Sequence, residues 1–360
     1  MKTLADLMNN EIKKLQLKNF KTLKDFINDD KSSSNFIKVL LDDDDYVEVD
    51  EISPIYTLAE ARARHSAITF LLGKIFYAFE DLSIFFASDI LKNVNNKDLN
   101  SKLWLLISLY HDYGYSSTLI LNENLNYEKI IRYYLLTDNY QETQLDKIRD
   151  FAKRQKKTLA YTYSEILDYD KYARNYHKEH KDKEKIDHGI LGGVIVFDRL
   201  VKKAIKFNSY NDLEIIKVIN LIIAQHNIYK SSNSKDDKAY PESLKKLKHF
   251  SSFKIDTNTP LLLFLSLVDT LECVKRFSKS YNKAENQFLK TMTVLNSIKL
   301  EVTEKTIVID YSVLKQELDN KKGLDFEAYF NAVLNLRTWT KFNTKKNSDT
   351  VLSISLKKTK

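Results

Sequence analysis

Five apolar segments of this chain each carry a histidine or an aspartate inside a pattern that otherwise belongs to a buried helix. Burying a lone imidazole or carboxylate removes its hydration and costs free energy, so this recurrence points to a shared partner for the polar groups. The residues concerned are His65, His111, Asp112, His188, His226 and Asp269. If the segments pack as a helical bundle, these side chains converge at its centre, where a metal cation would satisfy all of them.

Helical periodicity dominates the chain up to about residue 296. Apolar residues recur at three- and four-residue spacing over residues 1–28, in "RARHSAITFLL", in "SKLWLLISLYHD" and in "TPLLLFLSLVDTLECVKRF", as expected of helices that pack against a core. The chain has only 6 glycines and 3 prolines, too few for a turn-rich sandwich or for a glycine loop around a phosphate. We therefore predict a mainly α fold, with "LLDDDDYVEVDE" as an exposed acidic loop.

After about residue 296 the helical periodicity gives way to alternation of apolar and polar residues. "SIKLEVTEKTIVIDYS" alternates like two short strands around a polar turn, "FEAYFNAVLNLRTWTKF" is helical, and "TVLSISL" is a further strand candidate. These segments predict a small C-terminal α+β appendage. We accordingly divide the chain into an N-terminal helical extension with the acidic loop (1–54), a helical metal-binding domain (55–280), and a linker helix with the appendage (281–360).

Glycines stand beside two of the candidate ligand segments. Gly114 lies just past "SLYHD" and is predicted to end that helix in a left-handed conformation, which would put His111 and Asp112 on its last turn. Further glycines follow His188 in "DHGILGG". Because a glycine has no side chain, we expect these to let another helix pack closely, with close approach of a substrate phosphate as the alternative.

Charge and cysteine content restrict the cellular setting. The formal net charge of +8 favours phosphate-bearing partners, but the basic residues are spread over many helix faces, so nucleic acid is indicated only weakly. A single cysteine, Cys273, excludes an internal disulfide and suits a reducing compartment. The N-terminus lacks the apolar stretch of a signal peptide, and no apolar run is long enough to span a bilayer. We expect a cytoplasmic protein with no membrane association, and homo-oligomerisation stays open.

The order His65, then His111-Asp112, then Asp269 resembles the H…HD…D signature of the HD-domain metal-dependent phosphohydrolase superfamily. The resemblance covers roughly residues 55–280 and implies an HD-domain helical bundle. It also implies that these four residues hold one metal ion. The function implied is hydrolysis of a phosphoester by a metal-bound hydroxide.

Two further histidines extend the resemblance. His188 in "DHGILGG" and His226 in "IIAQHN" match the places where binuclear branches of the family have two additional ligands. They would help to hold a second metal ion, with Asp112 bridging both, so the resemblance implies two divalent ions. Imidazole and carboxylate ligands without thiolate suit Mn, Fe, Co, Ni or Zn, and ligand type does not choose among these metals.

Catalytic and substrate-binding roles can be assigned to fewer residues. His111 and Asp112 are the metal-centre residues with an expected catalytic role, and Asp187 could orient an imidazole, act as a general acid or cap its helix. Many family members have a phosphate-binding lysine where this chain has Tyr115, which carries no charge. The remaining candidates for contacting phosphate are Arg62, Arg64, Lys275 and Arg276. The alternative is that these four side chains simply lie on solvent-exposed helix faces and do not contact a substrate.

These features predict a metal-dependent phosphohydrolase acting on a nucleotide or another small phosphorylated molecule. Two alternatives stay open. A nuclease or cyclic-nucleotide phosphodiesterase with the same metals would need a basic groove and salt-dependent binding to nucleic acid. A catalytically silent nucleotide-sensing or scaffold protein would keep the helical fold and engage a partner through its appendage.

Overall fold

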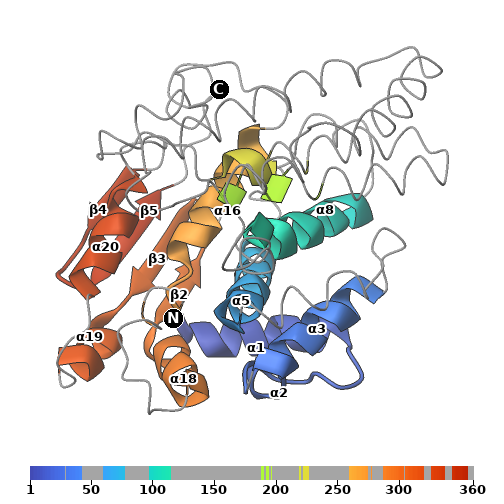
Figure 1. The fold of residues 1–360 in the computed structure, drawn as a ribbon. Coiled ribbons are helices and arrows are strands. Elements are labelled where there is room, and N and C mark those ends of the chain that lie inside the picture. The colour runs from blue at the N-terminus through green and yellow to red at the C-terminus, as the bar shows by residue number, and fades with distance from the viewer. Residues whose placement is uncertain are drawn as a thin grey trace, which may run out of the picture.

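The computed structural model describes residues 1–28, 30–42, 60–77, 97–114, 188–189, 192–193, 196, 219, 222–226, 259–274, 277, 287–303, 305–319, 326–336 and 343–355. Helices predominate within these ranges, and the described strands form one sheet (Figure 1). The predictions of a mainly helical fold and of strands near the C-terminus are therefore confirmed.

The described helices are α1 (Leu4–Leu15), α2 (Leu23–Ile27), α3 (Asp30–Asp42), α5 (Glu60–Tyr77), α8 (Lys97–Tyr110), α16 (Thr259–Leu271), α18 (Gln287–Ser297), α19 (Ser312–Asp319) and α20 (Phe326–Leu334). The described strands are β1 (Lys2–Thr3), β2 (Lys299–Val302), β3 (Thr306–Asp310), β4 (Asn343–Lys346) and β5 (Val351–Ser355). None of these helices combines the length and the apolar character needed to cross a membrane.

The helical pattern predicted over residues 1–28 corresponds to two helices rather than to one continuous helix. Gln16 adopts a left-handed conformation with φ 53°, and its N–H donates to the carbonyl of Lys13, which ends α1. A capping box of Thr22 and Asp25 then starts α2. No glycine or proline marks the end of α1, so hydrophobic periodicity alone does not predict that the helix stops at this point. Helix α3 lies within the predicted helical extension and includes residues 40–42, so the predicted acidic loop does not begin at residue 40. The rest of that loop lies outside the described residues.

Helices α5, α8 and α16 lie together at the centre of the described structure (Figure 1). The indole Nε1 of Trp104 on α8 donates to the carbonyl of Phe70 on α5 at 3.1 Å. Its ring packs against Phe264 of α16, with 4.6 Å between ring centroids. A Cβ at Gly73 would overlap the indole, so this glycine lets α5 and α8 approach each other. One buried tryptophan thus joins the three helices that carry candidate ligands.

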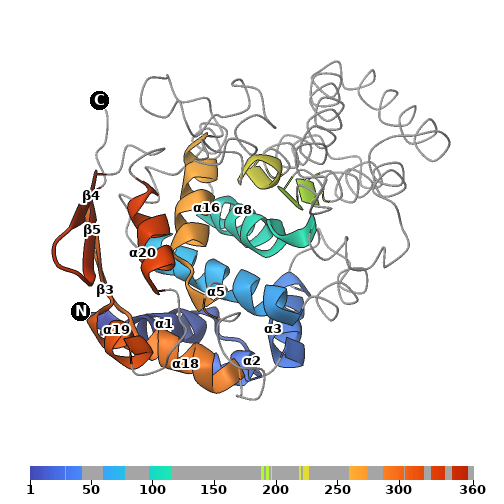
Figure 2. The same cartoon turned by 60° about the vertical axis from the view of Figure 1, so that its left-hand side comes forward.

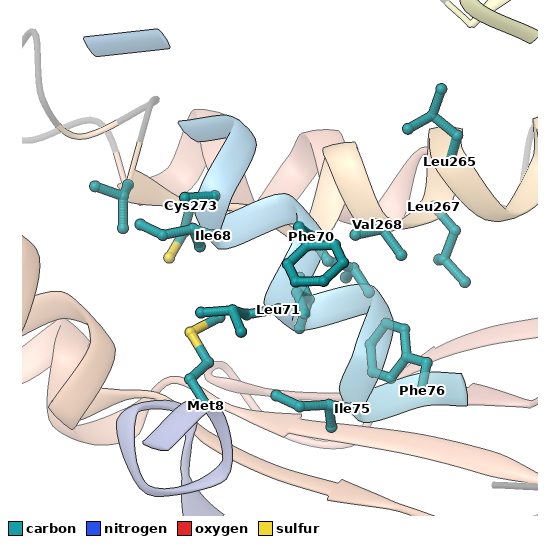
Figure 3. Close-up of a cluster of buried hydrophobic side chains, with 14 of the residues drawn as sticks. Met8, Ile68, Phe70, Leu71, Ile75, Phe76, Leu265, Leu267, Val268 and Cys273 are labelled. Carbon is teal, nitrogen blue, oxygen red and sulfur yellow. The ribbon is translucent and has the colours of Figure 1, made fainter. Parts of the chain in front are cut away.

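Apolar side chains fill the space between α1, α5 and α16. Figure 3 shows Met8 of α1 pointing toward Leu71 of α5, with Val268 of α16 behind the same helix. All three side chains are fully buried, at 0% exposure. Burial of this kind stabilises a fold by roughly 25 cal/mol for each Å² of apolar surface removed from water. The N-terminal helix therefore belongs to the same core as the helices of the candidate site.

The sheet has the strand order β1-β2-β3-β5-β4, with antiparallel neighbours throughout. Figure 2 shows it edge-on, with α20 and α16 on one side. The three predicted strands correspond to β2, β3 and β5, whereas β1 and β4 were missed. Strand β1 is short, and "NTKK" in β4 lacks apolar alternation. Because β1 pairs with β2, the first residues of the chain complete the C-terminal sheet, and the three-domain division stays a prediction.

Two buried tyrosines connect the end of α16 to the C-terminal elements. The hydroxyl of Tyr329 on α20 donates to the carbonyl of Leu271, the last residue of α16, at 2.8 Å. It also lies 2.9 Å from the hydroxyl of Tyr311. These hydrogen bonds hold the C-terminal turn of α16, where Asp269 lies, against α20.

Candidate metal centre

The six candidate ligands come together from five segments, as predicted. Their ligand atoms form two groups of three, and within each group these atoms lie within 4.8 Å of one another. The first group is His65, His111 and Asp269, and the second is Asp112, His188 and His226. Figures 1 and 2 show the short described pieces that contain His188 and His226, in green and yellow, close to α8 and α16.

The first group joins three helical segments. His65 lies on α5, Asp269 on α16, and His111 directly after α8, where its N–H still donates to the carbonyl of Ile107 at 3.0 Å. Nε2 of His65 lies 3.1 Å from Nε2 of His111 and 3.1 Å from Oδ1 of Asp269. Nε2 of His111 lies 3.5 Å from the same carboxylate oxygen. Three ligand atoms thus face a common point between the helices.

The second group is built around Asp112. Its Oδ1 lies 3.4 Å from Nε2 of His188 and 3.8 Å from Nε2 of His226. Its other oxygen, Oδ2, lies 3.4 Å from Nε2 of His65 in the first group. The carboxylate of Asp112 therefore faces both groups, which is the geometry required of a bridging ligand.

Two of the imidazoles have their outer nitrogen bound to the backbone. Nδ1 of His111 lies 2.7 Å from the carbonyl oxygen of Ser108, and Nδ1 of His226 lies 2.7 Å from that of Ile223. A carbonyl oxygen can only accept, so each Nδ1 carries a proton. In the neutral ring Nε2 is then an acceptor, and in both histidines it points toward the ligand groups.

His65 has the same arrangement with a side-chain acceptor. Its Nδ1 lies 2.9 Å from Oε2 of Glu272, whose side chain is 0% exposed. Neutral His65 therefore also turns an unprotonated Nε2 toward His111 and Asp269. Acceptor atoms at such distances repel each other unless a proton or a cation lies between them, and a metal ion satisfies several at once. This concentration of buried acceptors is the feature that best fits a metal site.

Burial, and to a smaller extent the neighbouring His111, lower the pKa of His226 from its ordinary value of 6.5 to about 4. The carboxylates of Asp112 and Asp269 act in the opposite direction but do not overcome this effect. His226 is therefore neutral at pH 7. A neutral imidazole is the form that binds a metal ion.

We expect the metal-free protein to lose about 2 kcal/mol of stability through His226 alone when the pH falls from 7.5 to 5. The unfolded chain takes up this proton near pH 6.5, whereas the folded protein resists it down to about pH 4. Acid therefore favours the unfolded state across that window. Urea unfolding of EDTA-treated protein at both pH values measures the loss. A His226→Gln variant should show a correspondingly weaker pH dependence, and an unchanged dependence would contradict the assignment.

The residues present suit a transition-metal ion in each group. Each group offers imidazole nitrogens and a carboxylate without thiolate, which fits Mn, Fe, Co, Ni or Zn. Each group offers three ligand atoms, and Asp112 of the second group also faces the first group through its other oxygen. The structure thus shows a buried His/Asp cluster that could bind metal and is compatible with an HD-type site.

Gly114 has a different role from the one predicted. Its backbone is not left-handed, and a Cβ at this position would overlap the carbonyl oxygen of His188. The same Cβ would lie 2.8 Å from the backbone nitrogen of Gly192. Gly114 is thus required for close backbone contact between the end of α8 and the segment that carries His188. The expected close packing at the glycines after His188 is confirmed at Gly192, and α8 ends at Tyr110, one residue before His111.

Of the other residues singled out in the sequence, only some lie in the described part of the structure. Arg64 on α5 is buried, with 5% exposure, so the solvated-face alternative is wrong for this residue, and its contact with substrate stays a prediction. Arg62 lies on the same helix, but its side chain is outside the described part of the chain. So are Tyr115, Asp187, Lys275 and Arg276. Cys273 is buried and belongs to the hydrophobic core.

Two residues that support the ligands were not predicted. Glu272 contacts His65, and Ser266 on α16 donates its hydroxyl to the carbonyl of His226 at 3.1 Å. Glu272 had a recognisable signal, because it is a carboxylate inside the apolar run "SLVDTLECV" three residues after Asp269. The Ser266 contact joins segments far apart in the chain and had no such signal.

Comparisons with known proteins found no match in protein families, curated proteins or solved structures. The functional interpretation therefore depends on the geometry and chemistry of the site.

Proposed function

We propose that this chain is a metal-dependent phosphohydrolase of the HD-domain superfamily that acts on a nucleotide or another small phosphorylated molecule. One observation carries the proposal: the carboxylate of Asp112 lies between two groups of buried acceptors, within 3.4 Å of both His65 and His188. Such an arrangement suits two neighbouring cations. The order of these residues in the chain adds the resemblance to the family signature.

Each ligand group would hold one cation, and Asp112 would contact both. Two neighbouring cations lower the pKa of a water molecule and polarise a phosphoryl oxygen, which are the requirements of phosphoester hydrolysis. The protein supplies the fixed orientation of the ligands. His111 and His226 are held by backbone carbonyls, and His65 is held by Glu272.

Exposure of the ligands indicates the side from which substrate would approach. The side chains of Asp269 and His188 are 22% and 15% exposed, whereas those of His65 and His111 are 1% and 0% exposed. A phosphate would therefore meet the site at Asp269 and His188. The carboxylates of Asp112 and Asp269 bring negative charge to the site, which repels phosphate. Bound cations are consequently needed for substrate binding as well as for chemistry.

Metal content and hydrolysis in the wild type test the proposal together. We expect about two transition-metal ions per chain after aerobic or anaerobic purification, and metal-dependent hydrolysis of p-nitrophenyl phosphate or of nucleotides. Preferred hydrolysis of bis(p-nitrophenyl) phosphate, with salt-dependent binding of single-stranded nucleic acid, would instead favour the diesterase or nuclease alternative. Absence of metal under every condition would overturn the catalytic proposal in favour of a binding protein.

We expect His188→Ala to lose one metal ion and to keep most of the other. His188 lies in the second group, with its Nε2 3.4 Å from Oδ1 of Asp112. Its partial exposure also makes truncation less damaging to the core than at His65. The measurement is metal content per chain by mass spectrometry, with hydrolysis assayed in parallel. His65→Ala is the matched comparison and should lose the first-group ion. Equal metal content in the wild type and the His188 variant would contradict a binuclear centre.

A further inference from the structure

We propose that Glu272 is a positioning residue of the metal centre, whose carboxylate holds His65 in the tautomer that carries its proton on Nδ1. This inference rests on the proposed function in one respect, since it takes Nε2 of His65 as a metal ligand. Glu272 itself does not face the ligand groups. It acts through His65, in the way that a carboxylate behind a metal-binding imidazole orients the ring and raises its basicity.

Both oxygens of the Glu272 carboxylate are used in this arrangement. Oε2 lies 2.9 Å from Nδ1 of His65, and Oε1 accepts a hydrogen bond from the backbone N–H of Val274 at 2.8 Å. The side chain is 0% exposed, and that of His65 is 1% exposed. A buried hydrogen bond of this kind is not weakened by competing water. The carboxylate is thus held at both oxygens in an orientation that presents an acceptor to His65.

The backbone at Glu272 is fixed as well. Its N–H donates to the carbonyl of Val268 at 2.9 Å, which continues the hydrogen bonding of α16 by one residue. The preceding carbonyl, that of Leu271, accepts from the hydroxyl of Tyr329 at 2.8 Å. Glu272 therefore has little freedom to withdraw from His65. Because Asp269 precedes it by three residues, one turn of α16 supplies both a ligand and the support of the neighbouring ligand.

Nδ1–H of His65 and the N–H of Val274 are two donors that each need an acceptor on Glu272. A carboxylate provides both, whereas the amide of a glutamine of the same shape provides one oxygen and one NH2 group. In Glu272→Gln the oxygen can remain with the N–H of Val274, and the NH2 group then faces Nδ1 of His65. That contact favours an unprotonated Nδ1 and moves the proton of the ring to Nε2. A protonated Nε2 cannot bind a metal ion.

The test compares the wild type with Glu272→Gln in two measurements. Nitrogen-15 NMR of histidine-labelled, EDTA-treated protein reports which ring nitrogen of His65 carries the proton, with the signal assigned by its loss in His65→Gln. Titration with Mn²⁺ or Zn²⁺ then reports affinity. We expect an Nδ1–H tautomer in the wild type, an Nε2–H tautomer in Glu272→Gln, and metal affinity lower by about 10- to 100-fold.

Two further variants separate positioning from general loss of structure. Glu11→Gln changes another buried glutamate, on α1, where the carboxylate accepts from Lys14 at 2.6 Å. It should leave both the His65 tautomer and the metal affinity unchanged. Glu272→Asp keeps two acceptor oxygens and should retain the Nδ1–H tautomer with only part of the affinity loss.

An Nε2–H tautomer in the metal-free wild type, or an unchanged tautomer in Glu272→Gln, would overturn the inference even if the protein binds metal and hydrolyses phosphoesters. The expected tautomer change supports the orientation of His65 by Glu272 independently of hydrolysis. Failure of the proposed function would appear separately, as absent metal binding or absent hydrolysis in the wild type.

Discussion

Asp112→Asn is expected to abolish binding of both metal ions and to lower the rate of hydrolysis by about 10³-fold, the equivalent of roughly 4 kcal/mol of lost transition-state stabilisation. The side chain keeps its shape but loses its charge. Its oxygens lie 3.4 Å from His65 in one group and 3.4 Å from His188 in the other, so the substitution changes the surroundings of both groups. Metal content per chain and steady-state hydrolysis measure the two effects.

Stability in the presence and absence of metal distinguishes loss of a ligand from loss of the fold. The amide NH2 introduced by Asp112→Asn can donate to a neighbouring imidazole Nε2, so the metal-free variant should unfold no more readily than the metal-free wild type. Added Mn²⁺ or Zn²⁺ should raise the melting temperature of the wild type only, because binding to the folded state stabilises it. A variant that is stabilised by metal as strongly as the wild type would show that Asp112 is not a ligand.

The convergence of the ligands could be predicted because it has a local signature. A histidine or aspartate within an apolar helical pattern is costly unless it finds a partner in the core, and this holds for each segment separately. His65 and Asp269 are examples: α5 and α16 were both predicted from periodicity, and both side chains enter the same group. The sequence pattern thus predicted which side chains cluster, but not the distances between them.

Contacts that depend on two distant backbones had no such signature. Gly114 was assigned to a helix end because glycine often has that role, but the structure uses it for contact with the backbone of His188. The helix break at Gln16 was missed for a related reason. A left-handed conformation at a non-glycine residue depends on its surroundings more than on its side chain. Local rules predict element types, whereas these positions are determined by packing between elements.

Support of the ligands lies between these two cases. Glu272 has the same local pattern as the candidate ligands, namely a carboxylate in an apolar run, but it is not part of the H…HD…D signature. Its partner, His65, is 207 residues away in the chain. The presence of a carboxylate in an apolar run therefore marks Glu272 as a residue that needs a buried partner. The structure was required to show that this partner is His65.

Gly114→Ala is expected to destabilise the protein by about 3 kcal/mol or more and to remove the second metal ion. In an unconstrained helix, alanine would be favoured over glycine by about 1 kcal/mol. Here the added methyl group would overlap the carbonyl oxygen of His188 and lie 2.8 Å from the backbone nitrogen of Gly192. Backbone atoms cannot rotate away as a flexible side chain does, so the overlap outweighs the gain in helix propensity. Urea unfolding and metal content per chain provide the two measurements.

Gly192→Ala is the graded control from the other side of the same contact. Its Cβ would lie 3.0 Å from the backbone nitrogen of Gly114 and 3.5 Å from Cγ2 of Ile223, so small shifts can relieve it. We expect a smaller loss of stability than in Gly114→Ala, with at least part of the second-group metal retained. If the two variants were equally stable, the overlap with the His188 carbonyl would not be the determining contact. If Gly114→Ala were more stable than the wild type, helix propensity would outweigh packing. That result would contradict the close contact of Gly114 with the backbone of His188 and Gly192. The comparison therefore tests the contact that brings His188 to Asp112, on which the second metal group depends.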